Sequence, residues 1–199
     1  MKRVLITLSA LICTLALSAQ TLLVADNPQT DAVYRLPLAK GAQVVATSLT
    51  PVQLGLGRSN NLVDFCAWEL TTTKSGAVFA PRAGVVEEAL ENRILIRHED
   101  GIYTQLRGLE SVSVAQGAKI DKGDEIGTAG KNGNKWSVWM EVFFMRKNEA
   151  YGTVAQSGNS ELLKQYINPI FTTRNKCKVL LTDGNSYTVK TRTWCWPWE

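Results

Sequence analysis

Short apolar or alternating stretches recur along the chain from residue 62 to residue 144, separated by glycine, aspartate and asparagine. They follow one another at about 8–12 residues, a spacing typical of an all-β sandwich or barrel. Asp100-Gly101 lies between two of them and predicts a hairpin turn. The expected strands span residues 43–48, 63–67, 78–80, 84–88, 93–98, 103–106, 111–114, 125–129 and 138–144.

One short helix is expected after these strands, over residues 160–166. Ser160 would cap its first turn, and Leu162 and Tyr166 would share one face. Asn168-Pro169 would end it, because the residue before a proline disfavours the helical conformation.

The C-terminal residues 175–199 predict an appendage with a β-hairpin, because residues 178–182 and 186–193 flank Asp183-Gly184. The appendage ends in Trp194, Trp196 and Trp198. These rings would either cover an apolar patch of the domain or contact a protein partner or sugar rings.

Three cysteines follow the N-terminal segment, namely Cys66, Cys177 and Cys195, and an odd number leaves at least one thiol unpaired within the chain. A two-residue turn at Asp183-Gly184 would set Cys177 opposite Lys190. A Cys177–Cys195 disulfide therefore requires the tail to fold back, and the sequence leaves that pairing open.

The first 19 residues have the pattern of a secretory signal peptide. Lys2 and Arg3 precede the apolar run of residues 4–17, and Ala19 supplies a small residue at the cleavage point. The run is shorter than the ~20 residues that a spanning helix needs, which favours cleavage over a membrane anchor. We therefore expect an exported protein of the periplasm or cell envelope, with no transmembrane segment after signal removal.

The composition, with 45% hydrophobic and 20% charged residues, is that of a globular protein. Its 22 basic and 18 acidic residues give a net charge of +4, and removal of the signal peptide takes away two of the basic residues. This balance is too mild to indicate nucleic-acid binding. We expect a leader over residues 20–33 and one β domain over residues 34–174.

A series of motifs between residues 63 and 169 occurs in the same order in one peptidase family. The motifs are Val63-Asp64-Phe65, Gly76-Ala77-Val78-Phe79-Ala80, Ala83-Gly84-Val85-Val86, the Asp100-Gly101 hairpin, Gly117, Gly123 and Gly127, Ser137-Val138-Trp139-Met140-Glu141-Val142, and Asn168-Pro169. In this order they resemble the LytM/lysostaphin-type zinc metallopeptidases over about residues 34–172. The resemblance implies a twisted β-sandwich of the duplicated-hybrid-motif type, with a groove across one sheet.

The family holds one zinc with two histidines and an aspartate, and a further histidine helps to activate the bound water. This chain contains a single histidine. A site of the family's composition is therefore excluded by counting, and we expect neither a zinc cofactor nor catalytic residues.

The resemblance also places the residues of a vestigial site. Asp64 matches the aspartate ligand, and Asn60 is the nearest polar residue to the first histidine position. Ser137 and Trp139 stand at the two histidine positions of the family's His-x-His strand, and Gly108 replaces the histidine of its Tyr-x-His-Leu motif. These five residues are expected to line a binding groove without metal.

Trp139 has two possible roles. It would either pack into the core and partly fill the groove, or form with Trp136 and Trp68 an aromatic floor for a peptide or a sugar ring. His98 matches a family histidine outside the zinc site, and we expect it to be hydrogen-bonded at the hairpin. Nothing in the sequence brings it together with Ser137 or Cys66 into a nucleophilic arrangement.

The sequence thus predicts a non-catalytic, LytM-like envelope protein that binds or regulates peptidoglycan or a cell-wall hydrolase through its groove. One alternative is an active cell-wall hydrolase with a rebuilt site. The other is a structural docking domain of an envelope complex that uses the tryptophan-rich tail.

Overall fold

The computed structural model describes residues 32–54, 65–145 and 164–190, which form strands and turns without a helix. The strands are β1 (Val33–Arg35), β2 (Gln43–Ser48), β3 (Ala67–Thr72), β4 (Ala77–Phe79), β5 (Gly84–Leu90), β6 (Arg93–Arg97), β7 (Tyr103–Arg107), β8 (Leu109–Val112), β9 (Lys119–Ile120), β10 (Glu125–Asn132), β11 (Lys135–Met145), β12 (Lys164–Tyr166), β13 (Ile170–Thr172) and β14 (Ser186–Thr188). The predicted all-β class is confirmed. Within these ranges, no helix is long and apolar enough to cross a membrane. The predicted signal peptide and the three tail tryptophans lie outside the described residues.

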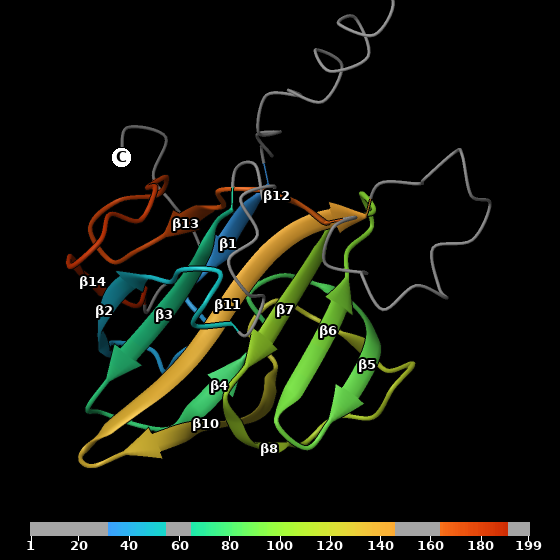
Figure 1. The fold of residues 1–199 in the computed structure, drawn as a ribbon, viewed down its shortest axis with the longest axis horizontal. Coiled ribbons are helices and arrows are strands. Elements are labelled where there is room, and N and C mark those ends of the chain that lie inside the picture. The colour runs from blue at the N-terminus through green and yellow to red at the C-terminus, as the bar shows by residue number, and fades with distance from the viewer. Residues whose placement is uncertain (1–31, 55–64, 146–163, 191–199) are drawn as a thin grey trace, which may run out of the picture.

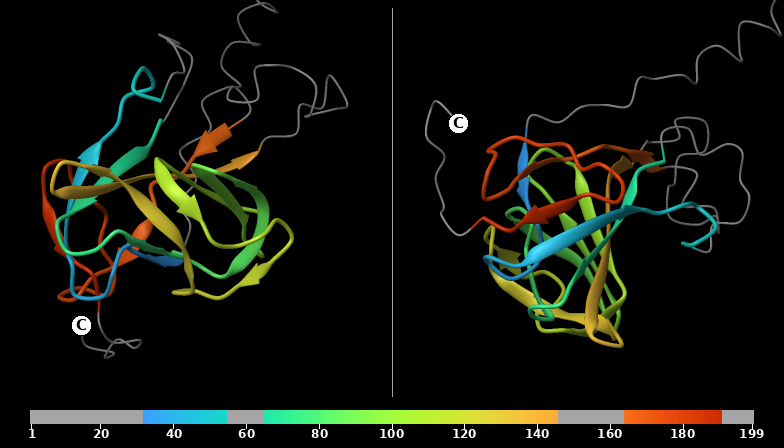
Figure 2. Two further views of the ribbon diagram at one scale, coloured as in Figure 1. Left: turned by 90° about the horizontal axis from the view of Figure 1, so that it is seen from below. Right: turned by 90° about the vertical axis from the view of Figure 1, so that its left-hand side faces the viewer.

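Most of the strands form one large sheet in the order β14-β2-β3-β11-β7-β6-β5-β9. Its long central strand, β11, runs diagonally across Figure 1 and pairs with β3 and β12 along one edge and with β7 along the other. A tight turn leads from β10 into β11, and β10 also pairs with β4 and β8 to form a second, smaller layer. β1 and β13 form a separate parallel pair. Figure 2 shows how strongly the large sheet is twisted.

The hydrophobic core lies between the large sheet and the layer of β4, β8 and β10. Alternate residues of β11 point into it, so that Val138, Met140 and Val142 are at most 1% exposed. Leu70 of β3 and Leu106 of β7 pair with them and are fully buried. The second layer contributes Val78, Leu109, Ile126 and Ala129 to the same cluster. We call this side of the large sheet the inner face.

The opposite side, here called the outer face, carries the residues in between. They are Glu69 and Thr71 of β3, Gln105 and Arg107 of β7, and Ser137, Trp139, Glu141 and Phe143 of β11. Because side chains alternate along a strand, every one-residue step along β11 changes from core to outer face.

The central hairpin forms where the sequence predicted it. β6 and β7 are joined through residues 98–102, and the His98 backbone N–H donates to the carbonyl of Ile102 at 2.8 Å. Gly101 has a φ of 78°, which explains the glycine of Asp100-Gly101. Of the strand expected over residues 63–67, residues 63 and 64 lie outside the described residues, and only Ala67 is in a strand, β3. That strand begins at Ala67 and runs to Thr72, because Trp68, Leu70 and Thr72 alternate into the inner face.

The helix predicted over residues 160–166 is wrong where the structure describes it. Lys164–Tyr166 is β12 and pairs antiparallel with residues 143–145 of β11. Tyr166 is fully buried and its ring lies edge-on against Phe143 at 6.2 Å. Pairing with β11 and burial of this aromatic ring override the weak helical pattern of a short segment.

The predicted C-terminal hairpin is also modified. The turn exists, since the Asn185 N–H donates to the carbonyl of Thr182 at 3.1 Å. Its two arms pair with the domain instead of with each other: β14 joins the edge of β2, and Val179 bridges Phe171. An open sheet edge offers unpaired backbone groups, and β14 satisfies them.

Cys177 is disulfide-bonded, and its partner lies outside the described residues. The Cys177–Cys195 pairing therefore stays a prediction.

Candidate functional site

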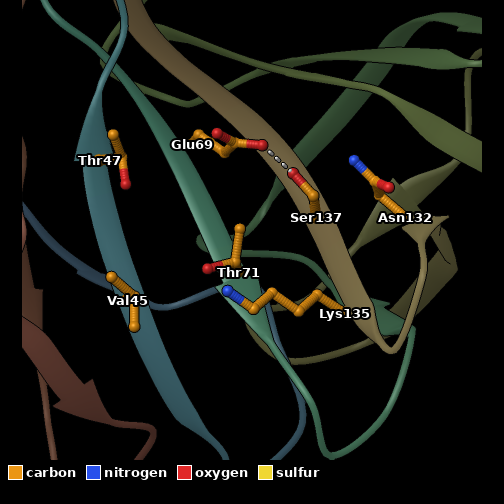
Figure 3. A pocket seen from close by; sticks show the side chains of 7 residues that line it. All are labelled: Val45, Thr47, Glu69, Thr71, Asn132, Lys135 and Ser137. Atoms are coloured by element: carbon orange, nitrogen blue, oxygen red, sulfur yellow. Dashed lines mark hydrogen bonds between the residues drawn. The ribbon is translucent and has the colours of Figure 1, made fainter.

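Ser137 and Trp139, the two β11 residues that the resemblance matches to histidines, lie on the outer face. Ser137 pairs with Thr71 of β3, and Trp139 pairs with Glu69 of the same strand. The Glu69 carboxylate accepts a hydrogen bond from the Ser137 hydroxyl at 2.6 Å and a longer one from the Trp139 indole N–H at 3.4 Å. Figure 3 shows the Ser137–Glu69 bond spanning the two strands. The structure thus brings both residues together around a carboxylate that the sequence analysis did not select.

Gly108 lies close to this pair. It follows Arg107, whose partner across β7 and β11 is Trp139. Its carbonyl accepts a hydrogen bond from Gly130 at 2.7 Å, and Gly130 is in register with Ser137. Gly108 is exposed, has a φ of 71°, and borders open space where a Cβ would lie. The position that the resemblance matches to a histidine is therefore a turn glycine without a side chain.

Asn60 and Asp64, the other two predicted groove residues, lie outside the described residues. Their contribution to the groove stays a prediction.

The residues found at the former ligand positions do not fit a zinc ion. An indole N–H only donates, a neutral serine hydroxyl is not among the usual zinc ligands, and Gly108 has no side chain. The one carboxylate between them, that of Glu69, already accepts from both neighbours. In the described part of the chain, no three His, Cys, Asp or Glu side chains are grouped in a way that could hold a metal ion.

Trp139 packs rather than forming an open floor. It packs, as Phe65 does, against a small hydrophobic cluster of Leu49, Leu54 and Ala67. Ala67 is the first residue of β3, and the two leucines lie between β2 and β3. The predicted aromatic floor with Trp136 and Trp68 is wrong. Trp68 belongs to the inner core cluster, and Trp136 packs against it. Trp136 precedes Ser137 on β11 and Trp68 precedes Glu69 on β3, and neighbouring residues of a strand point to opposite faces.

A buried group of charges continues the outer face beyond Trp139. The Glu141 carboxylate is 1% exposed and lies 3.1 Å from Nε of Arg107 and 3.3 Å from Nζ of Lys164. The Arg107 contact is an ion pair without hydrogen-bond geometry, so its attraction is mainly coulombic. Lys164 also donates to the Gln105 side chain at 3.0 Å and lies 4.4 Å from the centre of the Phe143 ring. The sequence analysis missed this group because Lys164 arrives on β12, the strand predicted as a helix.

His98, the single histidine of the chain, is buried and hydrogen-bonded. Its ring is 1% exposed, with Nδ1 2.8 Å from the Ala83 carbonyl and Nε2 2.7 Å from the Thr104 hydroxyl. It also lies edge-on to Tyr34 at 5.7 Å. Burial lowers the pKa of His98 to about 4, so the ring is neutral at physiological pH. The predicted hydrogen-bonded histidine at the hairpin is confirmed.

Cys66 lies just before β3 and is a free cysteine. Burial raises the pKa of its thiol to about 11, well above that of a reactive cysteine. The hydrogen bonds of His98 go to Ala83 and Thr104, and the Ser137 hydroxyl donates to Glu69. Neither nucleophile is therefore activated by the histidine.

Residues 66–153 match peptidase family M23. No curated protein matches the chain. Among solved structures, a chain of the SpoIIIAH and SpoIIQ complex is 22% identical, with a TM-score of 0.41 over 55% of this chain and 90% of that one. Pseudoalterin, an M23 metalloprotease from the deep sea, is 13% identical, with a TM-score of 0.47 over 82% and 98%. A zinc-containing peptidase from Vibrio cholerae is 18% identical, with a TM-score of 0.42 over 60% and 41%.

The family match covers the central hairpin, β10 and β11, which carry most of the motifs on which the predicted resemblance rested. The resemblance to the LytM/lysostaphin-type peptidases is confirmed, in that residues 66–153 of this chain match the model of peptidase family M23.

Proposed function

We propose that this M23 domain is a non-catalytic binding domain of the cell envelope, which binds peptidoglycan or regulates a cell-wall hydrolase through its outer face. The observation that carries the proposal is the replacement chemistry on β11. Ser137 and Trp139 stand at the positions that the resemblance matches to histidines, and both donate hydrogen bonds to Glu69. The indole of Trp139 also packs against a small hydrophobic cluster. Zinc peptidase chemistry needs nitrogen and carboxylate ligands with one open position for water. One histidine in 199 residues cannot supply them.

The hydrolase alternative has little support in the described residues. A rebuilt site needs a nucleophile within reach of a base. His98 is buried and engaged on both nitrogens, and the Cys66 thiol is held protonated. These features favour binding over hydrolysis. The envelope location rests on the predicted signal peptide.

The mature chain tests the proposal directly. We expect purified protein to contain no stoichiometric zinc, to leave cell-wall sacculi undigested, and to co-sediment with sacculi or to change the activity of a purified cell-wall amidase. One tightly held zinc per chain, or digestion of sacculi, would overturn the proposal.

A pair of matched variants locates the binding surface. Thr47→Arg places a bulky cation on the outer face next to Glu69, whereas Thr182→Arg makes the same change on an exposed turn before β14. We expect the first variant to weaken binding and the second to leave it unchanged. If neither matters but deletion of residues 194–199 abolishes binding, the docking-domain alternative replaces the groove proposal.

A further inference from the structure

A pocket of about 310 Å³ opens on the outer face, next to the Ser137–Glu69 hydrogen bond. Its polar lining consists of Thr47, Glu69, Thr71, Asn132, Lys135 and Ser137. These side chains come from β2, β3, β11 and the end of β10, as the labels in Figure 3 show. The volume is at the lower end of the range for small-molecule sites, and several polar groups converge on it, as in such sites.

The turn between β10 and β11 builds one side of this pocket. Asn132 and Lys135 are paired across a two-residue loop, Gly133-Asn134, whose glycine has a φ of 61°. Such turns match the twist of the flanking strands and fix their register. The register places Lys135 on the same side of β11 as Ser137, two residues further along.

Two residues of opposite charge, Glu69 and Lys135, line the pocket without forming an ion pair. Among the described residues, no ion pair joins Glu69 to Lys135, and the Lys135 ammonium has no hydrogen-bond partner. One oxygen of Glu69 accepts from Ser137 and Trp139, which fixes the carboxylate in place and leaves its second oxygen without a partner in the described part of the chain. The side chains of Thr47, Thr71 and Asn132 are likewise without polar partners among these residues.

A ligand that complements this arrangement carries one positive and one negative group. Its positive group matches the half-buried carboxylate of Glu69, and its negative group matches the exposed ammonium of Lys135, each through a charge-assisted hydrogen bond. The pocket has room for about ten water molecules at ~30 Å³ each. That corresponds roughly to the ten or so non-hydrogen atoms of a dipeptide of two small residues.

We propose that this pocket binds a short zwitterionic peptide with both termini free, its ammonium at Glu69 and its carboxylate at Lys135. The hydroxyls of Thr47 and Thr71 and the amide of Asn132 are available to the peptide group between the termini. This inference rests on the proposed function, because it names a ligand class for the same outer face.

Titration of the mature protein with alanyl-alanine, followed by calorimetry or by NMR shifts, tests the site. N-acetyl-alanyl-alanine lacks the ammonium, and alanyl-alanine amide lacks the carboxylate. We expect each to bind about tenfold more weakly than the zwitterion or worse, since each leaves one charge of the pocket unmatched.

Two variants assign the charges to the two ends of the ligand. Glu69→Gln keeps an oxygen acceptor for Ser137 and removes the charge, so it should abolish the preference for the free ammonium alone. Lys135→Met should abolish the preference for the free carboxylate alone. Glu110→Gln and Lys178→Met make the same changes at exposed positions outside the pocket and should leave both preferences intact.

Absence of saturable alanyl-alanine binding up to about 10 mM would overturn this inference. Equal binding of the acetylated or amidated peptide, or preferential binding of a neutral disaccharide, would do so as well. In a protein free of zinc that does not digest sacculi, such results leave the proposed function standing. Zinc or digestion would instead overturn the proposed function, whatever the dipeptide does.

Discussion

The two faces of β11 differ in the kind of interactions that their side chains make. On the inner face, Val138, Met140 and Val142 pack into a continuous core. On the outer face, Ser137 and Trp139, which the resemblance matches to histidines, both donate hydrogen bonds to Glu69. Because neighbouring residues of one strand point to opposite sides, ligand chemistry can change on one face while the core stays intact on the other.

The largest expected effect is a difference in the stability lost by substitutions on the two faces. Leu106→Ala removes a fully buried inner-face side chain of β7 and should lower the free energy of unfolding by roughly 3–5 kcal/mol. Ser137→Ala, on the outer face, removes one hydrogen bond and should cost about 1 kcal/mol. Urea denaturation of both variants measures the difference. Similar costs for the two would contradict the division into a packed face and a replaceable one.

Glu141 lies on the outer face and is nevertheless 1% exposed, so its substitution is expected to affect stability. Glu141→Gln would leave Arg107 and Lys164 close together without the carboxylate between them. We expect a loss of about 3 kcal/mol, because the substitution removes the shared carboxylate of two ion pairs that is itself 1% exposed. Glu110→Gln, at an exposed position, is the matched control. A loss below that of Ser137→Ala would show that the charged group contributes little to stability.

The single histidine gives the smallest of the three effects and a characteristic pH dependence. Burial places the pKa of His98 at about 4 in the folded protein, below its ordinary value of 6.5 in the unfolded chain. The unfolded chain therefore binds more protons between these values, and stability falls as pH decreases from 6.5 toward 4. We expect His98 to contribute a loss of roughly 2 kcal/mol between pH 7 and pH 5.

Unfolding measured at both pH values in the wild type and in His98→Gln isolates this contribution. The variant should be less sensitive to pH over the same interval, whatever its absolute stability. The same pH dependence of stability in the variant and the wild type would mean that the pKa of His98 is not lowered by burial in the folded protein.

Local signals in the sequence were sufficient to predict the positions of many strands and turns of the large sheet. Residues 43–48 form β2 as expected, and Asp100-Gly101 makes the turn between β6 and β7. Alternating apolar residues and turn glycines act over a few neighbouring positions, so a single chain segment contains the information. The predictions failed at residues 164–166 and at the C-terminal hairpin, where the strand partner comes from a distant part of the chain.

The same division applies to the candidate site. The histidine count and the residues at positions 108, 137 and 139 are properties of the sequence, and they alone argue against a zinc site of the family type. Tertiary structure decided that Glu69 joins Ser137 and Trp139, that Lys164 reaches Glu141, and that Lys135 shares a pocket with Glu69. The physical reason is that each of these arrangements depends on the register between strands far apart in sequence, and register is fixed only when the whole sheet packs on its core.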